Sequence, residues 1–373
     1  MDFSLSDEQQ MLLDTTRRFI ASEYSFAHRA KVLESAQGWS RDVWRRLGEL
    51  GVLAVDIPEE DGGVGAGAIG VMLVAQAIGE GLLLEPFLSS AVVATRVIVQ
   101  LGSALQRERW LPALASGEQV AVLAHDEEGG ALDVLKIAAR AIRNDRGWSL
   151  SGRKSGVYHA PAADVLLVSA LIEDGTPTLF VVPAGAARVR RADFRTVDGQ
   201  CAADLVFDAV DVAADSRLDG DVAAALATAI DRGTAALCAE AIGTLDRVLK
   251  ATIEYSRSRV QFGVPIGSFQ ALQHRMADML MHVEQARSMS YLATSRCTEP
   301  DAQVRRMALS RAKALIGQAA RFVGQQAVQL HGGMGMTDEL DVSHCFKRLL
   351  AFELRFGTAD EHLDMCRQDL LAT

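Results

Sequence analysis

A cation, an aromatic ring and an amide occur together in the segment 255–270. Its letters are YSRSRVQFGVPIGSFQ, and Arg259, Phe262 and Gln270 are the residues with binding chemistry. A guanidinium fork can hold a phosphate, a phenyl ring can face a planar ring system, and an amide can both donate and accept hydrogen bonds. The same residues also suit the end of a long helix, where an arginine complements the helix dipole. The pattern alone leaves both interpretations open.

A second segment, 329–337, reads QLHGGMGMT and offers bare backbone. Gly332 and Gly333 can adopt positive φ and leave their N–H groups accessible, so the segment can approach an anion or a flavin closely. A helix stop followed by a turn is the simpler interpretation of this segment taken alone.

Other short patterns lack the context that their chemistry requires. Residues 65–70 spell GxGxxG, but the run PEED at 58–61 stands before the glycines, where a dinucleotide site needs a strand. Residues 151–154 spell SxxK in an expected hairpin, without the partner motifs of that chemistry. His331 and His344 are not spaced for a shared metal on one helical face, so no metal site is expected.

The hydrophobic periodicity of the chain that must position these segments changes twice. Residues 1–120 have helical periodicity, with Ser6 as an N-cap and Gln9 at the third position of the first helix. Residues 121–215 break into short Val- and Leu-rich runs, which predicts a β barrel or sandwich. From 220 to 373 the helical period returns in four long helices, which indicates a four-helix bundle. The predicted fold class is therefore α+β, mainly α.

Composition narrows the class of function. The net charge of -10 over 373 residues argues against a nucleic-acid binder and against docking on an anionic membrane. The longest apolar stretch, 71–84, is interrupted by polar residues and glycines, so no membrane span is expected. Five scattered cysteines without a CxxC pair, and an acidic start without a targeting signal, predict free thiols in a cytoplasmic protein.

Together, the two segments resemble the acyl-CoA dehydrogenase family. The pattern is RxQFGxPIxxFQ followed by QxHGGxGM, on a chain with α, β and α regions in that order. The SLSDEQQ opening, the IPEEDGGVG loop and the GTAD segment at 357–360 extend the resemblance over essentially the whole chain. Within the family, the sequence is similar to the small subunit of pimeloyl-CoA dehydrogenase. It is also similar to partner subunits of heteromeric bacterial enzymes that act on bulky or dicarboxylic CoA thioesters.

This resemblance implies an FAD-dependent oxidoreductase of acyl-CoA metabolism. Such an enzyme removes an α proton from a CoA thioester while the flavin takes a hydride from the β carbon, which leaves a trans-2-enoyl-CoA. The residues that would contact an FAD held mainly by a neighbouring subunit are Arg259, Phe262 and Gln270, then Gln329, Gly332 and Gly333, with Thr358 nearby. The resemblance also implies a homo- or hetero-oligomer arranged as a dimer of dimers, and an acceptor similar to electron-transfer flavoprotein.

The chain departs from the family pattern at the position of the catalytic base. Family members commonly carry a carboxylate in an E-G-T segment, and Phe356 stands at that position here. Other members carry it on an earlier helix, where this chain has Gly233. Neither residue can accept a proton, so the catalytic residue is unknown. The acids nearby in sequence are Glu353, Asp360, Asp231 and Glu240, and helical spacing aims none of them at a thioester.

The β region departs from the family as well. A TExxxGSD-like loop that touches flavin and substrate is replaced by HDEEGGALD at 125–133, and a flavin-packing Trp-x-Thr by Gly156-Val157-Tyr158. The residues expected to contact a neighbour's FAD are therefore all present, whereas those expected to contact the chain's own flavin ring are replaced. Two hypotheses follow: a working dehydrogenase with an unrecognised base, or a structural subunit that completes a partner's FAD site. A helical scaffold without a cofactor is a third.

Overall fold

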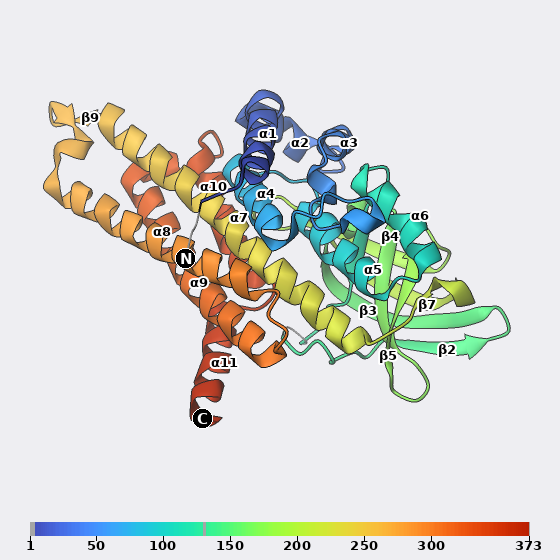
Figure 1. The fold of residues 1–373 in the computed structure, drawn as a ribbon. Helices are drawn as coiled ribbons and strands as arrows, with labels where there is room; N and C mark the ends of the chain where they lie inside the picture. The colour runs from blue at the N-terminus through green and yellow to red at the C-terminus, as the bar shows by residue number, and fades with distance from the viewer. Residues whose placement is uncertain (1–3, 130–131, 373) are drawn as a thin grey trace. The chain divides into compact units, whose positions relative to one another are not determined.

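The computed structural model describes residues 4–129 and 132–372. Contacts divide the chain into two compact units, which are described separately. Unit 1 comprises Met1–Leu12, Ala30–Val71 and Leu84–Gly233, and unit 2 comprises Leu13–Arg29, Met72–Leu83 and Thr234–Thr373. The element order of helices, a sheet and helices again confirms the predicted fold class (Figure 1). The domain boundaries at 120 and 215–220 remain a prediction.

Helices fill the first third of the chain. They are α1 (Asp7–Glu23), α2 (Phe26–Glu34), α3 (Arg41–Glu49), α4 (Gly67–Gly81), α5 (Thr95–Leu101) and α6 (Ala104–Ala115), with a π-helical stretch at Phe87–Ala94. The predicted cap of the first helix is confirmed, because the Ser6 hydroxyl accepts from the Gln9 N–H while the Gln9 amide oxygen accepts from the Ser6 N–H. The prediction omitted α2, a nine-residue helix.

The middle of the chain forms one sheet within unit 1. Its strands are β1 (Ala121–Ala124), β2 (Arg140–Asn144), β3 (Gly147–Tyr158), β4 (Val165–Leu171), β5 (Pro177–Pro183), β6 (Val189–Arg195), β7 (Cys201–Ala213) and β8 (Arg217–Leu218). Their order is β6-β7-β3-β2-β4-β5-β8, with β1 parallel to β4. The turns after Asn144 and Leu171 join antiparallel neighbours. Strand β6 was not predicted, because this edge strand is almost wholly exposed and has no apolar alternation.

The last part of the chain is a helical bundle that belongs mainly to unit 2. Its helices are α7 (Val222–Ser258), α8 (Gln270–Arg296), α9 (Ala302–His331), α10 (Asp341–Leu354) and α11 (Ala359–Ala372). The sequence predicted the first four, and α11 is an addition. A hairpin of β9 (Val260–Gln261) and β10 (Val264–Pro265) joins α7 to α8 at one end of the bundle (Figure 1).

One helix of this bundle is long and apolar enough, by length and composition, to cross a membrane. It is α7, whose most apolar window has a mean hydropathy of 1.3 and is 72% buried inside the molecule. A buried core helix passes the same test, so its hydropathy is explained by packing.

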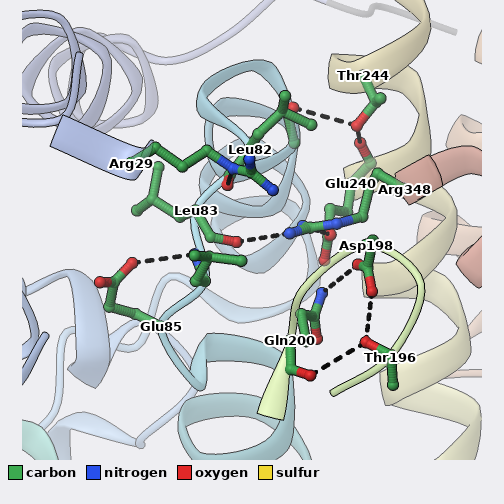
Figure 2. Close-up of polar contacts among 12 residues, drawn as sticks. Arg29, Leu82, Leu83, Glu85, Thr196, Asp198, Gln200, Glu240, Thr244 and Arg348 are labelled. Atoms are coloured by element: carbon green, nitrogen blue, oxygen red, sulfur yellow. Dashed lines mark hydrogen bonds and ion pairs between the residues drawn. The ribbon is translucent and has the colours of Figure 1, made fainter. Parts of the chain in front are cut away.

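Buried arginines hold the end of α4 in unit 2. The Arg29 Nε donates to the Leu82 carbonyl at 2.8 Å, and the Arg348 Nη2 donates to the Leu83 carbonyl at 2.9 Å (Figure 2). The Arg348 Nη1 also donates to the Glu240 carboxylate at 2.6 Å. Leu82 has a φ of 55°, which leaves its carbonyl outside the helical hydrogen-bond pattern. The two guanidinium groups therefore satisfy carbonyls that the helix cannot.

Replacement of Arg348 by methionine should strongly destabilise the protein. It would leave the Glu240 carboxylate buried without its cation and the Leu83 carbonyl without this donor, and losing one partner of a buried ion pair costs about 3–5 kcal/mol. Urea unfolding of the purified chain would measure this loss. The matched control is Arg367→Met, since Arg367 pairs with Asp364 on an exposed helix face and should change stability by less than about 0.5 kcal/mol. Equal effects of the two substitutions would contradict the role of Arg348 in holding the end of α4.

Candidate functional site

The hairpin between α7 and α8 presents an exposed aromatic ring. Phe262 and Gly263 form its two-residue turn, with φ values of 55° and 81°. This turn geometry favours Asn or Gly, and a left-handed phenylalanine costs about 1–2 kcal/mol. The Phe262 side chain is nevertheless 93% exposed, and its ring contact is an edge-on approach to Phe269 at 6.1 Å. The two-residue turn imposes this conformation, and burial of the ring within the chain does not offset its cost.

Arg259 and Gln270 flank this turn. Arg259 follows the last residue of α7, and its carbonyl accepts from the Ile266 N–H at 2.8 Å. The guanidinium is exposed and makes no hydrogen bond or ion pair with any residue that the structure describes. Gln270 is the exposed first residue of α8. The three residues predicted from the first segment thus lie on the hairpin and on the two helix ends that it connects.

The second segment lies at the same end of the bundle. The Tyr255 ring stacks on the His331 ring with centroids 4.3 Å apart, which joins the end of α7 to the end of α9. Gly332 has a φ of 62°, and a Cβ placed on Gly332 or Gly333 would meet nothing within 4 Å. Gln329 is exposed beside them. We call the set Arg259, Phe262, Gln270, Gln329, Gly332 and Gly333 the hairpin–glycine surface.

Thr358 does not belong to this surface. It caps α11, because its hydroxyl accepts from the Glu361 N–H at 3.2 Å and its own N–H donates to the Glu361 carboxylate at 2.8 Å. The segment around Thr358 contacts α9 at Lys313, 19 positions before Gly332 in the chain, which is about 28 Å along a helix. One chain therefore has two separate groups of predicted cofactor-contact residues.

The segment that contains Phe356 is held by side chains at four consecutive residues. The Phe356 carbonyl lies 2.8 Å from the His362 Nε2, and the Gly357 carbonyl accepts from the Lys313 Nζ at 2.7 Å. The next two residues donate their N–H groups to carboxylates, Thr358 to Glu361 and Ala359 to Glu353. Phe356 itself has a φ of 57° and is half-buried, with the Arg355 guanidinium 5.3 Å from its ring centroid.

The candidate substitute acids are occupied in other ways. Glu240 is buried and pairs with Arg348, and Glu353 accepts from the Ala359 N–H at 2.6 Å. Asp231 is buried, while Asp360 is exposed on α11. Gly233 is a buried residue of α7 at the end of unit 1. Neither of the two family positions for the base therefore offers a carboxylate.

The loop at 125–133 of unit 1 is organised by a buried lysine that the sequence analysis did not assign to it. Lys154 on β3 is fully buried, and its Nζ donates to Glu127 at 2.6 Å, to Ser169 at 2.8 Å and to the His125 carbonyl at 3.1 Å. Glu127 in turn accepts from the N–H groups of Ala138 and Ala139. Part of this loop, residues 130–131, lies outside the described residues. The SxxK lysine thus anchors a loop and does not activate Ser151.

The replacements for the flavin-packing motif lie on β3. Gly156 has a φ of 62° and donates its N–H to the Asp204 carboxylate at 2.8 Å. Tyr158 is half-buried, with its ring 6.5 Å from that of His159. Within the described part of the chain, no group of three His, Cys, Asp or Glu side chains is placed to hold a metal ion.

Lys313 should make the stability of the protein depend on pH in the alkaline range. Burial lowers its pKa from 10.5 to about 8. Between about pH 8 and 10.5 the unfolded chain therefore holds a proton that the folded protein has released, so the free energy of unfolding rises with pH, by at most about 1.4 kcal/mol per pH unit. Lys313→Met removes this contribution. The stability difference between wild type and Lys313→Met, measured by urea unfolding, should grow in favour of wild type across that window and stay level below it. A stability difference that stays constant with pH would contradict a lowered pKa of the buried Lys313 amine.

Comparison with known proteins places the chain in one family. Residues 6–118 match the model of the acyl-CoA dehydrogenase N-terminal domain, and residues 223–371 match that of the acyl-CoA dehydrogenase C-terminal domain. Acyl-CoA dehydrogenase FadE27 of Mycobacterium tuberculosis is 29% identical, over 100% of both chains.

Two solved structures are similar over nearly the whole chain. The ChsE4-ChsE5 complex from Mycobacterium tuberculosis aligns with a TM-score of 0.89 and 28% identity over 100% of both chains. A Tcur3481-Tcur3483 steroid ACAD variant aligns with a TM-score of 0.89 and 29% identity over 99% of both chains. With its α–β–α fold and its two matched segments, this chain belongs to the acyl-CoA dehydrogenase family, flavin-dependent oxidoreductases that act on the CH–CH bond of acyl-CoA.

Proposed function

We propose that this chain is one subunit of a heteromeric acyl-CoA dehydrogenase and that it completes an FAD site on a partner subunit. In this proposal the partner carries the catalytic carboxylate. The observation that carries it is a contrast within unit 2. The hairpin–glycine surface is exposed, and its Arg259 guanidinium makes no hydrogen bond or ion pair with the described residues, whereas the position of the family's base holds Phe356.

The chemistry of the hairpin–glycine surface fits one edge of an FAD. The free Arg259 guanidinium can bind a phosphate, and the exposed Phe262 ring can cover an apolar face of the cofactor. The open backbone at Gly332 and Gly333, which follows the end of α9, allows close approach of a pyrophosphate. When bound, FAD supplies the acceptor for the hydride that leaves the substrate. This chain's residues would bind and orient it and exclude water from one side.

The two similar complexes support a heteromeric assembly. Both are named as pairs of different proteins, ChsE4 with ChsE5 and Tcur3481 with Tcur3483. The word steroid in the second name supports a bulky acyl group on the CoA thioester. A dimer of dimers, an acceptor similar to electron-transfer flavoprotein and a cytoplasmic location are further parts of the proposal. All five cysteines are free, which suits a reducing compartment.

Removal of the free cation or the exposed ring should weaken retention of FAD by the complex. Arg259→Ala deletes a phosphate contact, and a hydrogen bond to a charged group is worth about 1.5–3 kcal/mol, so we expect FAD affinity to fall about 10- to 100-fold. Phe262→Ala removes the ring that would cover the cofactor and should act in the same direction, while its Cβ leaves the strain of the turn in place. Flavin fluorescence during dilution of the co-purified complex measures the release.

Arg296→Ala is the control for these variants. Arg296 also lies at a helix end in the bundle, but it pairs with Glu299 at the end of α8 opposite the hairpin. It should leave FAD affinity unchanged. Equal retention of FAD by all three variants would remove the hairpin–glycine surface from the FAD site.

The location of the base is tested by turnover. A phenyl ring cannot accept a proton, so Phe356→Ala in the complex should lower kcat by less than about tenfold. Removal of the partner's carboxylate should lower it by about 100-fold or more. Steady-state oxidation of an acyl-CoA by the purified complex gives both values. Turnover by this chain alone, at about 1 per second or faster, would show instead that it is a homomeric dehydrogenase with its own base.

A further inference from the structure

The side chains that form hydrogen bonds with the backbone of residues 356–359 come from different parts of the chain. Three of them are local, since Glu353, Glu361 and His362 lie on α10 and α11, directly beside the segment. These three could form in a hairpin of α10 and α11 alone. Lys313 comes from α9, and its bond to the Gly357 carbonyl spans 44 positions of the chain. Its direct bonds therefore attach the segment to the body of the bundle.

Lys313 is an unusual choice for a purely structural contact. Its side chain is fully buried, and its Nζ donates to the carbonyls of Phe352 and Gly357 at 2.9 and 2.7 Å and lies 4.1 Å from the centre of the Phe352 ring. Among the described residues no carboxylate forms an ion pair with it, although Glu353 and Glu361 face it at longer range. A buried ammonium without a carboxylate in direct contact is costly, and a methionine of similar length would fill the space without that cost.

The conformation of Phe356 is imposed by these surroundings. A φ of 57° is unfavourable for a residue with a side chain and persists only where neighbouring contacts determine it. The bonds on either side of the strained residue use backbone carbonyls, so they do not depend on the residue type at 356. The backbone at this position would therefore be the same for a different side chain.

We propose that Lys313 is the positioning residue for position 356: by donating to the carbonyls of Phe352 and Gly357 it holds the backbone where the family carries its base. This inference rests on the proposed function for the meaning of position 356, but its geometry belongs to this chain alone. Lys313 fixes the direction in which residue 356 points, and Ser310, one turn earlier on α9, supports the same segment through His362. The segment thus remains organised although it holds a phenyl ring.

The test places 4-fluorophenylalanine at position 356 and follows its 19F resonance in the purified full chain. With Lys313 present, we expect one narrow resonance that shifts with pH, with a midpoint near 8, as the adjacent amine loses its proton. In Lys313→Met the resonance should move, broaden and lose this transition. Lys347→Met is the matched control, because Lys347 lies on α10 but pairs with Asp338 near the start of that helix. It should keep the wild-type resonance and midpoint.

Other titrating groups near the amine are distinguishable. Those facing it are Cys238 on α7, Glu353 on α10, and Glu361 and His362 on α11. Burial raises the pKa of Cys238 to about 12 and lowers that of His362 below 6.5, so neither has a midpoint near 8. A transition near pH 8 that disappears only in Lys313→Met identifies the lysine.

Two outcomes would overturn the inference. One is a Lys313→Met protein whose 19F resonance keeps the position and width of wild type. The other is a wild-type resonance that is broad or split, since a segment held by Lys313 should give one narrow line; this outcome counts even if Lys313→Met fails to fold. Neither measurement uses FAD, substrate or a partner subunit. The positioning role can therefore fail while the proposed function stands, and the reverse also holds.

Discussion

Buried cations in this protein donate to backbone carbonyls at or near the ends of helices and strands. Lys313 donates to the carbonyls of Phe352 and Gly357, where α10 ends and α11 begins. Arg29 and Arg348 do the same for Leu82 and Leu83 at the end of α4, and Lys154 for His125 at the start of its loop. The last carbonyls of a helix lack internal donors, and an ammonium or guanidinium taken out of water must keep its hydrogens bonded. The cations supply the donors that these carbonyls lack, and the carbonyls supply acceptors for the buried N–H groups. These contacts set the path of the chain at three junctions.

Because these contacts involve backbone groups, the backbone structure of the site does not depend on which side chains it carries. The segment at 356–359 keeps its shape through bonds to carbonyls and N–H groups, so it tolerates a residue that cannot act as a base. The hairpin–glycine surface shows the opposite arrangement, because Phe262 is strained and exposed and the Arg259 guanidinium is unengaged among the described residues. A chain that keeps the contacts offered outward while losing its own base is what a division of labour between two subunits would produce.

Much of this could be predicted from sequence because the signals were local. Ser6 with Gln9 marked a capping box, which the structure confirms. The two segments of the hairpin–glycine surface stood out by residue type, their assignment to FAD came from the resemblance to the family, and the structure places both at one end of the bundle. Strand β6 was missed because edge strands need no apolar face. The roles of Lys313 and Lys154 could not be predicted, since each depends on acceptors that are brought close only by the fold.

The central claim is that this chain completes an FAD site which it cannot build alone. The most direct measurement is the visible absorbance spectrum of the purified chain, recorded alone and after co-expression with a candidate partner subunit of the same family. The account predicts no flavin band for the chain alone and a band from stoichiometric FAD in the co-purified complex. A chain that carries a full complement of FAD by itself would contradict it, since the site would then be complete without a different subunit.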